Sequence, residues 1–135
     1  SVDTAYGELA WKLRQNPKVV VMERTNVLQL TELPEKVDLV TIDAGWTRLE
    51  LVLPIVGQFL KEGGQIIALL KPHYQADKKD LKGGVLSQQQ ADEVKEETLT
   101  HLRGVLDQMV SPIKGGAGNQ EYLLLIQPNL LRSDL

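Results

Sequence analysis

Residues 37–71, VDLVTIDAGWTRLELVLPIVGQFLKEGGQIIALLK, determine the fold class that this sequence predicts. One apolar run in this stretch ends at Asp43, and a second run, residues 65–70, is followed by Lys71. A helical pattern and a Gly-Gly turn lie between the two runs. Two apolar strands joined by a helix form a β-α-β unit, and open α/β sheets bind their ligands at the carboxyl ends of such strands. We therefore expect an α/β fold with Asp43 and Lys71 at one edge of its sheet.

The rest of the chain alternates between strand and helix patterns. We expect strands at residues 18–22, 37–43, 65–70, 105–110 and 122–126. The first three should be parallel, and the final strand should be antiparallel to them. We expect helices at residues 6–16, from Thr47 to the Gly63-Gly64 turn, and from Ser87 to about Arg103, with irregular loops at 72–86 and 111–119.

Short motifs mark the starts of two of these helices. Thr47–Glu50 and Ser87–Gln90 both have the spacing of a capping box. Pro54 interrupts the first of the two helical patterns and predicts a kink or a later helix start. The charged cluster at residues 92–97 is expected to form a solvated face of the second helix.

The composition is that of a single ordinary globular domain, with 42% hydrophobic and 24% charged residues in a chain of 135. Cysteine is absent, which excludes disulfides and thiolate metal sites, and two isolated histidines are too few for a metal site. The apolar runs are much shorter than the roughly 20 residues of a membrane-spanning helix. A net charge of −3 gives no general attraction for nucleic acid.

Several segments, taken together and in order, resemble one known family. They are VDTAYGELAWKLRQNPKVVVMERTNV at residues 2–27, VDLVTIDAGWTRLELVLP at 37–54, GGQIIALLKPHYQ at 63–75, KGGV at 82–85 and SPIKGGAGNQEYLLLI at 111–126. These segments resemble the catalytic domain of TlyA-type proteins, the haemolysin-named branch of the FtsJ-like ribosomal-RNA ribose methyltransferases. Because the likeness covers most of residues 2–126, it is more specific than any single motif.

The resemblance implies a Rossmann-like sheet and S-adenosylmethionine-dependent 2′-O-methylation of RNA, ribosomal RNA in particular, by a cytoplasmic protein. The family uses a Lys-Asp-Lys-Glu tetrad, and the last three members of that tetrad correspond to Asp43, Lys71 and Glu121. Asp3 corresponds to the acid that binds the ribose of the cofactor, and Asn26 to the residue that faces its adenine. These five residues are our candidates for the catalytic and cofactor-binding sites.

Other family features are missing from this sequence. The first strand, its Gly-rich loop and the first tetrad lysine would precede Asp3, as would an RNA-binding module. We therefore expect residues 1–127 to form a partial catalytic domain and residues 128–135 to form a tail. This partial domain should bind S-adenosylmethionine weakly or not at all and should be inactive alone. A missing central strand leaves sheet edges unpaired, which favours a homodimer or strand exchange between two copies. Gly45-Trp46-Thr47-Arg48 also replaces the family's Ser-Phe-Ile-Ser, and His73 replaces a more usual Gln.

Methylation of a ribose requires that a hydroxyl group, a very weak acid, becomes a nucleophile at neutral pH. A neighbouring lysine can accept the hydroxyl proton, or it can remain charged and stabilise the alkoxide. Because two carboxylates stabilise the ammonium form, we expect Asp43 and Glu121 to orient Lys71. Positioning of the hydroxyl against the methyl carbon supplies much of the remaining rate enhancement.

Taken singly, the same residues have ordinary structural explanations. A strand-end Asp is commonly a cap, a rim Lys is usually solvated, and Glu121 is equally explained as an edge-strand charge, so the three gain weight only jointly. Asn26 is equally explained as a turn residue. Trp46 either stacks on a nucleobase or is buried against the sheet. The pairs Gly83-Gly84 and Gly115-Gly116 are expected to be conformational, because glycine accepts positive φ.

One segment, residues 71–82, has four lysines against Asp77 and Asp80 and predicts a positive lobe that could hold a phosphate backbone. Our leading interpretation is an RNA ribose methyltransferase domain. One alternative is a non-catalytic Rossmann-like interaction or scaffold module, which the altered segment 45–48 would permit. Another is a methyltransferase that acts on a base or a small molecule, against which the candidate lysine argues. A pore-forming function has no support, since nothing in the sequence spans or coats a membrane.

Overall fold

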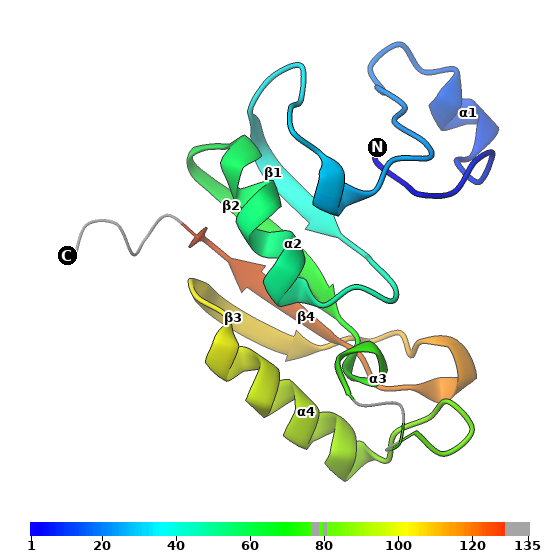
Figure 1. The fold of residues 1–135 in the computed structure, drawn as a ribbon, viewed down its shortest axis with the longest axis vertical. Coiled ribbons are helices and arrows are strands. Elements are labelled where there is room, and N and C mark those ends of the chain that lie inside the picture. The colour runs from blue at the N-terminus through cyan, green and yellow to red at the C-terminus, as the bar shows by residue number, and fades with distance from the viewer. Residues whose placement is uncertain (77–78, 80, 129–135) are drawn as a thin grey trace. The chain divides into compact units, whose positions relative to one another are not determined.

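The computed structural model describes residues 1–76, 79 and 81–128. The chain divides into two compact units, residues 1–35 and the chain from Lys36 onward, each with its own internal contacts. Figure 1 shows the elements of both units. None of the helices in the described ranges is long and apolar enough to cross a membrane.

The first unit contains two short helical segments, α1 (Trp11–Arg14) and the 3-10 turn η1 (Val27–Gln29). Its other regular feature is a parallel bridge between Val2 and Met22. The Ser1 amino group donates to the Val20 carbonyl at 2.9 Å, and the Met22 N–H donates to the Ser1 carbonyl at 2.8 Å. Residues 1–3 therefore run alongside the segment that begins at Val20.

Two sequence predictions for this unit are wrong. The helix expected at 6–16 is reduced to α1, because Gly7 has a φ of +79° and its N–H donates to the Glu23 side chain instead of continuing a helix. The run expected as a strand at 18–22 forms only the bridge at Met22. A β ladder needs a partner of matching length, and within this unit the described partner is just residues 1–3.

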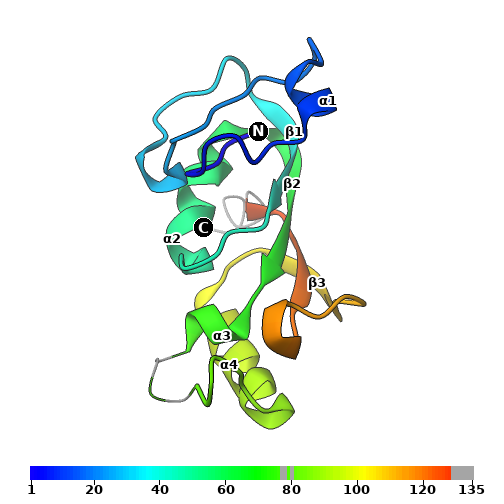
Figure 2. The ribbon, with the colours of Figure 1, turned by 90° about the vertical axis from the view of Figure 1, so that its right-hand side faces the viewer.

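The second unit is a mixed four-stranded sheet with the strand order β1-β2-β4-β3 (Figures 1 and 2). β1 pairs parallel with β2, and β4 pairs antiparallel with both β2 and β3. The parallel pairing of 37–43 with 65–70, the strand at 105–110 and the antiparallel final strand are thus confirmed. The strands are β1 (Val37–Ile42), β2 (Leu60–Leu70), β3 (Val105–Val110) and β4 (Tyr122–Ile126).

The helical elements of this unit are α2 (Leu49–Val56), η2 (Gly57–Phe59), α3 (Pro72–Gln75), α4 (Gln88–His101) and η4 (Gly116–Gly118). The capping box at Ser87–Gln90 is confirmed, since each residue's side chain accepts a hydrogen bond from the other's backbone N–H. The capping box at Thr47 is wrong. Arg48 is the N-cap residue of α2, and no side chain caps the helix, which runs through Pro54.

The end of this helical region also differs from the prediction. The Gly63-Gly64 turn was expected to end it, but η2 stops at Phe59 and β2 already begins at Leu60. Leu60 is almost completely buried and pairs with Val37 of β1, so tertiary burial extends the strand to this point. Gly63, with a φ of +74°, therefore lies inside β2.

The core lies on the face of the sheet that α2 covers (Figures 1 and 2). Alternate residues of the two central strands are buried on this face, and the register pairs them directly: Ile66 with Ile126, Ala68 with Leu124, and Leu70 with Tyr122. α2 adds Leu49, Val52, Leu53 and Val56. Complete burial of one such aliphatic side chain contributes about 1.5–3 kcal/mol, so these pairs hold the two central strands in register.

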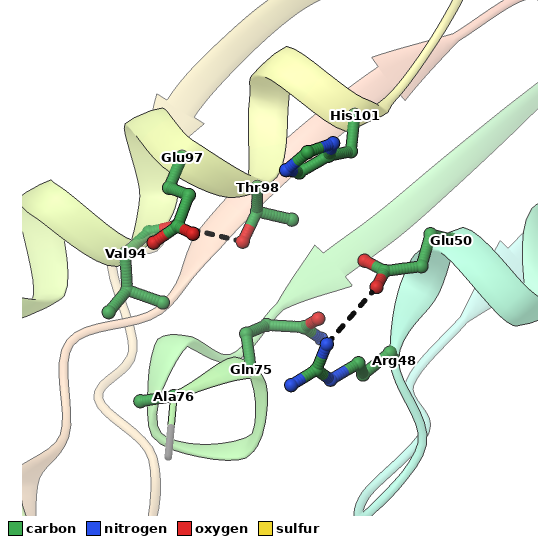
Figure 3. Close-up of a pocket in the computed structure, with 8 residues that line it drawn as sticks. All are labelled: Arg48, Glu50, Gln75, Ala76, Val94, Glu97, Thr98 and His101. Carbon is green, nitrogen blue, oxygen red and sulfur yellow. Dashed lines mark hydrogen bonds and ion pairs between the residues drawn. The ribbon is translucent and has the colours of Figure 1, made fainter. Parts of the chain in front are cut away.

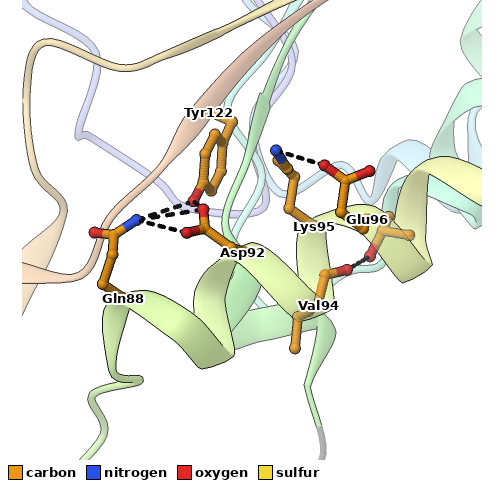
Figure 4. A network of polar contacts seen from close by, with 7 residues as sticks. Gln88, Asp92, Val94, Lys95, Glu96 and Tyr122 are labelled. Carbon is orange, nitrogen blue, oxygen red and sulfur yellow. Dashed lines mark hydrogen bonds and ion pairs between the residues drawn. The ribbon is translucent and has the colours of Figure 1, made fainter.

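α4 contributes a polar contact to β4 (Figure 4). The buried Tyr122 hydroxyl donates to the Asp92 carboxylate, which also accepts from Gln88 Nε2 at 3.3 Å. Lys95 Nζ lies 5.1 Å from the centre of the Tyr122 ring. The prediction of a solvated face at residues 92–97 is therefore wrong for Asp92 and Lys95, which pack on a buried tyrosine.

The Tyr122 hydroxyl should titrate at unusually high pH. Burial and the hydrogen bond to Asp92 raise its pKa to about 12 from an ordinary value of 10.0. Because the folded pKa is the higher one, this contribution to stability is complete below about pH 10 and is lost as the pH rises through about 12.

The test is Tyr122→Phe, which removes the hydroxyl and leaves Asp92 with Gln88 as its remaining side-chain donor. We expect the free energy of unfolding at pH 7 to fall by about 1–2 kcal/mol, measured by urea denaturation. Gln89→Ala, which removes an exposed hydrogen bond on the same helix, should change it by less than about 0.5 kcal/mol. A spectrophotometric titration in which Tyr122→Phe leaves the most alkaline tyrosine transition in place would contradict the account.

Candidate active site

Three strand ends meet at one edge of the sheet in the second unit. Asp43 directly follows β1, Lys71 directly follows β2, and Glu121 directly precedes β4. Since β4 is antiparallel to β2 and Tyr122 pairs with Leu70, the start of β4 lies beside the end of β2. The three catalytic candidates from the sequence are therefore brought to one place.

The contacts among these three residues are electrostatic. Lys71 Nζ lies 2.6 Å from Asp43 Oδ1, an ion pair in which 18% of the lysine side chain and 68% of the aspartate side chain are exposed. Glu121 is buried. Burial raises the pKa of its carboxyl group, the Lys71 charge lowers that pKa, and the Asp43 charge raises it again. One lysine thus lies in the field of two carboxylates, one at the surface and one inside.

A cleft of about 250 Å³ opens at this edge. It is lined by Trp46, Lys71, His73, Tyr74, Leu81, Gly84, Gly116, Asn119 and Glu121. Its residues come from the loop after β1, the turn after β2, and the two glycine-containing loops. The cleft therefore combines one cation, one buried carboxyl group and three aromatic or imidazole rings.

Asn119 is a site residue that was not among the candidates predicted from the sequence. It is buried, and its amide group links the two loops that border the cleft. Its Oδ1 accepts from the Leu86 N–H at 3.1 Å, and its Nδ2 donates to the Gly84 carbonyl at 2.9 Å. These bonds join residues more than 30 positions apart, so no local sequence pattern indicates them.

The glycines of these loops have two different roles. Gly83 and Gly84 have φ values of +62° and +81°, so the prediction that they are conformational is confirmed. For Gly115 that prediction is wrong, because its φ is −69°, which any residue adopts. Gly115 is instead required because it has no side chain: a Cβ atom at this position would overlap the carboxyl group of Glu121.

An aromatic cluster stands at the mouth of the cleft. Trp46 is 81% exposed, so its expected alternative of burial against the sheet is wrong. Its ring centre lies 4.7 Å from that of Tyr74, and the His73 ring lies 4.3 Å from the same tyrosine. Burial, and to a smaller extent the Lys71 charge, lowers the pKa of His73. His73 is therefore neutral at pH 7 and adds no second cation beside Lys71.

A second hollow, of about 380 Å³, lies between the start of α2, α3 and α4 (Figure 3). It is lined by Arg48, Glu50, Gln75, Ala76, Val94, Glu97, Thr98 and His101. Arg48 faces this space but pairs with Glu50 at 3.4 Å. Its charge is thus partly compensated, and none of the three catalytic candidates lines this hollow.

The two cofactor-binding candidates belong to the first unit. The Thr25 N–H donates to the Asp3 carbonyl at 2.9 Å, so Asp3 and Asn26 lie on adjoining segments. Each side chain also closes a local turn: Asp3 Oδ1 accepts from the Ala5 N–H, and Asn26 Oδ1 accepts from the Leu28 N–H, both at 2.9 Å. The turn role considered for Asn26 is therefore real.

Those turns leave part of each side chain available. The second Asp3 carboxylate oxygen and the Asn26 amide NH₂ belong to exposed residues. A carboxylate oxygen suits the hydroxyl groups of a ribose, and an amide donor suits the ring nitrogens of adenine. The chemistry of this pair therefore fits the nucleoside part of S-adenosylmethionine.

The expected positive lobe at residues 71–82 can be described only in part. Asp77, Lys78 and Asp80 lie outside the described residues. Lys82 is exposed and forms a β bridge with Val85. Within the described ranges, no group of three or more His, Cys, Asp and Glu residues could hold a metal ion.

Comparison with known proteins shows the family of the chain. The sequence profile of the FtsJ-like methyltransferases matches residues 1–127. The chain belongs to the FtsJ-like methyltransferase family. Methyltransferases of this family take their methyl group from S-adenosylmethionine. The similar proteins described next assign the chain to the TlyA/hemolysin branch.

The curated relatives of this family member are bacterial. It is 37% identical over 94% of its length to the 16S/23S rRNA (cytidine-2′-O)-methyltransferase TlyA of Mycobacterium tuberculosis. It is 38% identical over 92% of its length to YqxC of Bacillus subtilis, which is provisionally named an rRNA methyltransferase. The chain covers 50% of the first relative and 47% of the second, so it spans about half the length of the curated relatives that it matches.

Solved structures agree with this FtsJ-like assignment. A Lactococcus lactis protein, provisionally named a hemolysin, superimposes with a TM-score of 0.84 at 31% identity. That match covers 93% of this chain and 64% of the other. The α/β class and the mixed four-stranded sheet are thereby those of known FtsJ-like structures.

The close contact at Gly115 generates a steric test. Gly115→Ala should displace the Glu121 carboxyl group and lower the free energy of unfolding by about 1–3 kcal/mol, as expected for overpacking. Gly116→Ala is the matched control, because its added Cβ meets nothing within 4 Å. Equal stability of the two variants in thermal or urea denaturation would show that the Glu121 carboxyl group does not occupy the described position.

The raised pKa of Glu121 generates a pH test. A carboxyl group whose folded pKa is raised is protonated more readily in the folded state, so its ionisation costs stability at neutral pH and costs none at low pH. Glu121→Gln should therefore have a higher melting temperature than wild type at pH 7, and the difference should shrink as the pH falls toward about 4 and be absent below it. Glu62→Gln, at an exposed residue of β2, is the control. Destabilisation by Glu121→Gln at pH 7 would mean that attraction to Lys71 outweighs the cost of burial.

Proposed function

We propose that this chain is the catalytic part of an S-adenosylmethionine-dependent methyltransferase that modifies ribose 2′-hydroxyl groups in ribosomal RNA. The observation that carries the proposal is the ion pair between Lys71 and Asp43 beside the buried Glu121, at the edge of a cleft. Its support from relatives is the rRNA (cytidine-2′-O)-methyltransferase activity in the name of the Mycobacterium tuberculosis protein.

Lys71 carries the central role in this proposal. Two carboxylates lie beside its ammonium group, which acts as a fixed positive charge that stabilises the developing alkoxide of the ribose while the hydroxyl proton passes to water. The Asp43 ion pair fixes the direction of the ammonium group. Glu121 attracts the same ammonium group from the buried side of the cleft, where water screens this attraction less.

The methyl donor is S-adenosylmethionine, which when bound supplies a methyl group on a positively charged sulfur. Asp3 and Asn26 would hold its ribose and adenine through the polar atoms that their turns leave available. The protein's remaining task is to hold the acceptor hydroxyl close to Lys71 and aligned for displacement. A ring nitrogen or carbon acceptor would gain nothing from a fixed cation at this position, which favours a hydroxyl acceptor.

Substitutions at Lys71 test the proposal in the full-length protein encoded by the gene that contains this sequence. Lys71→Ala should lower the single-turnover rate of methyl transfer to ribosomal RNA by about 100-fold or more, while affinity for S-adenosylmethionine changes little. Lys71→Arg should be almost as damaging, because its planar fork does not match a compact ammonium group. Asp3→Ala should instead weaken cofactor binding first.

Lys61→Ala is the matched control for these variants. Lys61 pairs with Asp38 at 2.9 Å between the same two strands as Lys71 and Asp43, but at their opposite end. This substitution should leave the methyl-transfer rate within about twofold. Retention by Lys71→Ala of more than about a tenth of the wild-type rate, a loss below roughly 1.4 kcal/mol, would remove Lys71 from the catalytic group. Absence of transfer by the wild-type protein would favour a non-catalytic scaffold.

A further inference from the structure

Trp46 has an unusual position for a large aromatic residue. It lies in the loop between β1 and α2, it is 81% exposed, and its φ of +62° is in the left-handed region. Positive φ is uncommon for bulky residues and costs free energy, and exposure of an indole gives up the benefit of burial. Neither property helps this chain to fold.

The local structure nevertheless holds the indole in place. Its ring centre lies 4.7 Å from that of Tyr74, with 45° between the ring planes. The Tyr74 ring also lies close to the main chain before Trp46, since a Cβ atom added at Gly45 would be in ordinary van der Waals contact with it. His73 contacts the same tyrosine at 4.3 Å. The result is a supported aromatic surface with an exposed indole.

This surface belongs to the same cleft as the catalytic candidates. Trp46, Tyr74 and Lys71 all line it, and Lys71 Nζ lies 5.8 Å from the centre of the Tyr74 ring. A ligand that lies on the indole is therefore next to the cation that the proposed chemistry uses.

Flat aromatic surfaces beside positive charges are how proteins hold unpaired bases of single-stranded nucleic acid. Building on the proposed function, we propose that Trp46, supported by Tyr74, stacks on an RNA base at the mouth of the cleft and so positions that nucleotide beside Lys71. The ligand class is unpaired RNA, and the contact is to the face of the base. Any of the four bases has such a face, so the platform contributes affinity and position but little base specificity.

The test compares two RNA probes in the full-length protein by fluorescence anisotropy. One is a labelled single-stranded RNA of about ten nucleotides, and the other has the same sugar-phosphate backbone with abasic nucleotides. Wild type should bind the first about tenfold or more tightly than the second. Trp46→Ala should lose most of this preference, whereas Trp46→Phe should keep much of it. Trp11→Ala, at another exposed tryptophan, should keep all of it.

Folding of each variant is checked by circular dichroism. Trp46→Gly serves as a second deletion of the ring, since glycine accepts the positive φ at this position without strain. A preference for bases that persists in Trp46→Ala and Trp46→Gly, or that wild type lacks, would overturn the proposal.

The base-preference test of the stacking site and the methyl-transfer test of the proposed function can succeed or fail separately. Loss of base preference in the Trp46 variants, with no methyl transfer by wild type, would support the stacking site and reject the enzyme. Methyl transfer by wild type, with base preference unchanged in the Trp46 variants, would support the enzyme and reject the stacking site.

Discussion

The position of β2 between a parallel and an antiparallel neighbour is the constraint on which the rest of the structure depends. β1 runs parallel to β2, so both strands end at the same edge of the sheet, while β4 runs antiparallel and begins there. The buried pair of Leu70 and Tyr122 fixes this register. A slip of one residue in β4 would turn every core side chain of that strand to the opposite face. The same slip would move Glu121 away from Lys71, so the packing of the core and the geometry of the site are one property.

The site itself is built from opposed electrostatic and steric demands. The charge of Lys71 is attracted by two carboxyl groups. Burial, however, makes ionisation of Glu121 unfavourable and raises its pKa. The Glu121 carboxyl group fits in its buried position because Gly115 has no side chain there. The hydrogen bonds of Asn119 hold together the loops that border the same cleft. Trp46 shows the same pattern, with an exposed ring in an unfavourable backbone conformation. Local costs of this kind are typical of functional sites, where geometry is selected over stability.

The sequence predicted features that depend on local pattern. Apolar runs found four of the strands, the Ser87 capping box found the start of α4, and the family resemblance found the three catalytic candidates. The prediction was wrong where contacts distant in sequence determine the secondary structure. Residues 18–22 have the pattern of a strand, but within their unit they can pair with only three residues, 1–3. Asn119 and the Tyr122–Asp92 bond were not predicted, because they join residues distant in sequence.

Membership of the FtsJ-like family is shown, and the reaction of this chain is our proposal. One measurement tests that reaction directly by identifying the atom that receives the methyl group. Ribosomal RNA that lacks the modification is incubated with the full-length protein and S-adenosylmethionine carrying a deuterated methyl group, digested to nucleosides and analysed by mass spectrometry. The account predicts that the label appears on the 2′-oxygen of ribose, and that Lys71→Ala abolishes this product. Label on a base, or no label from a folded protein that binds the cofactor, would contradict it.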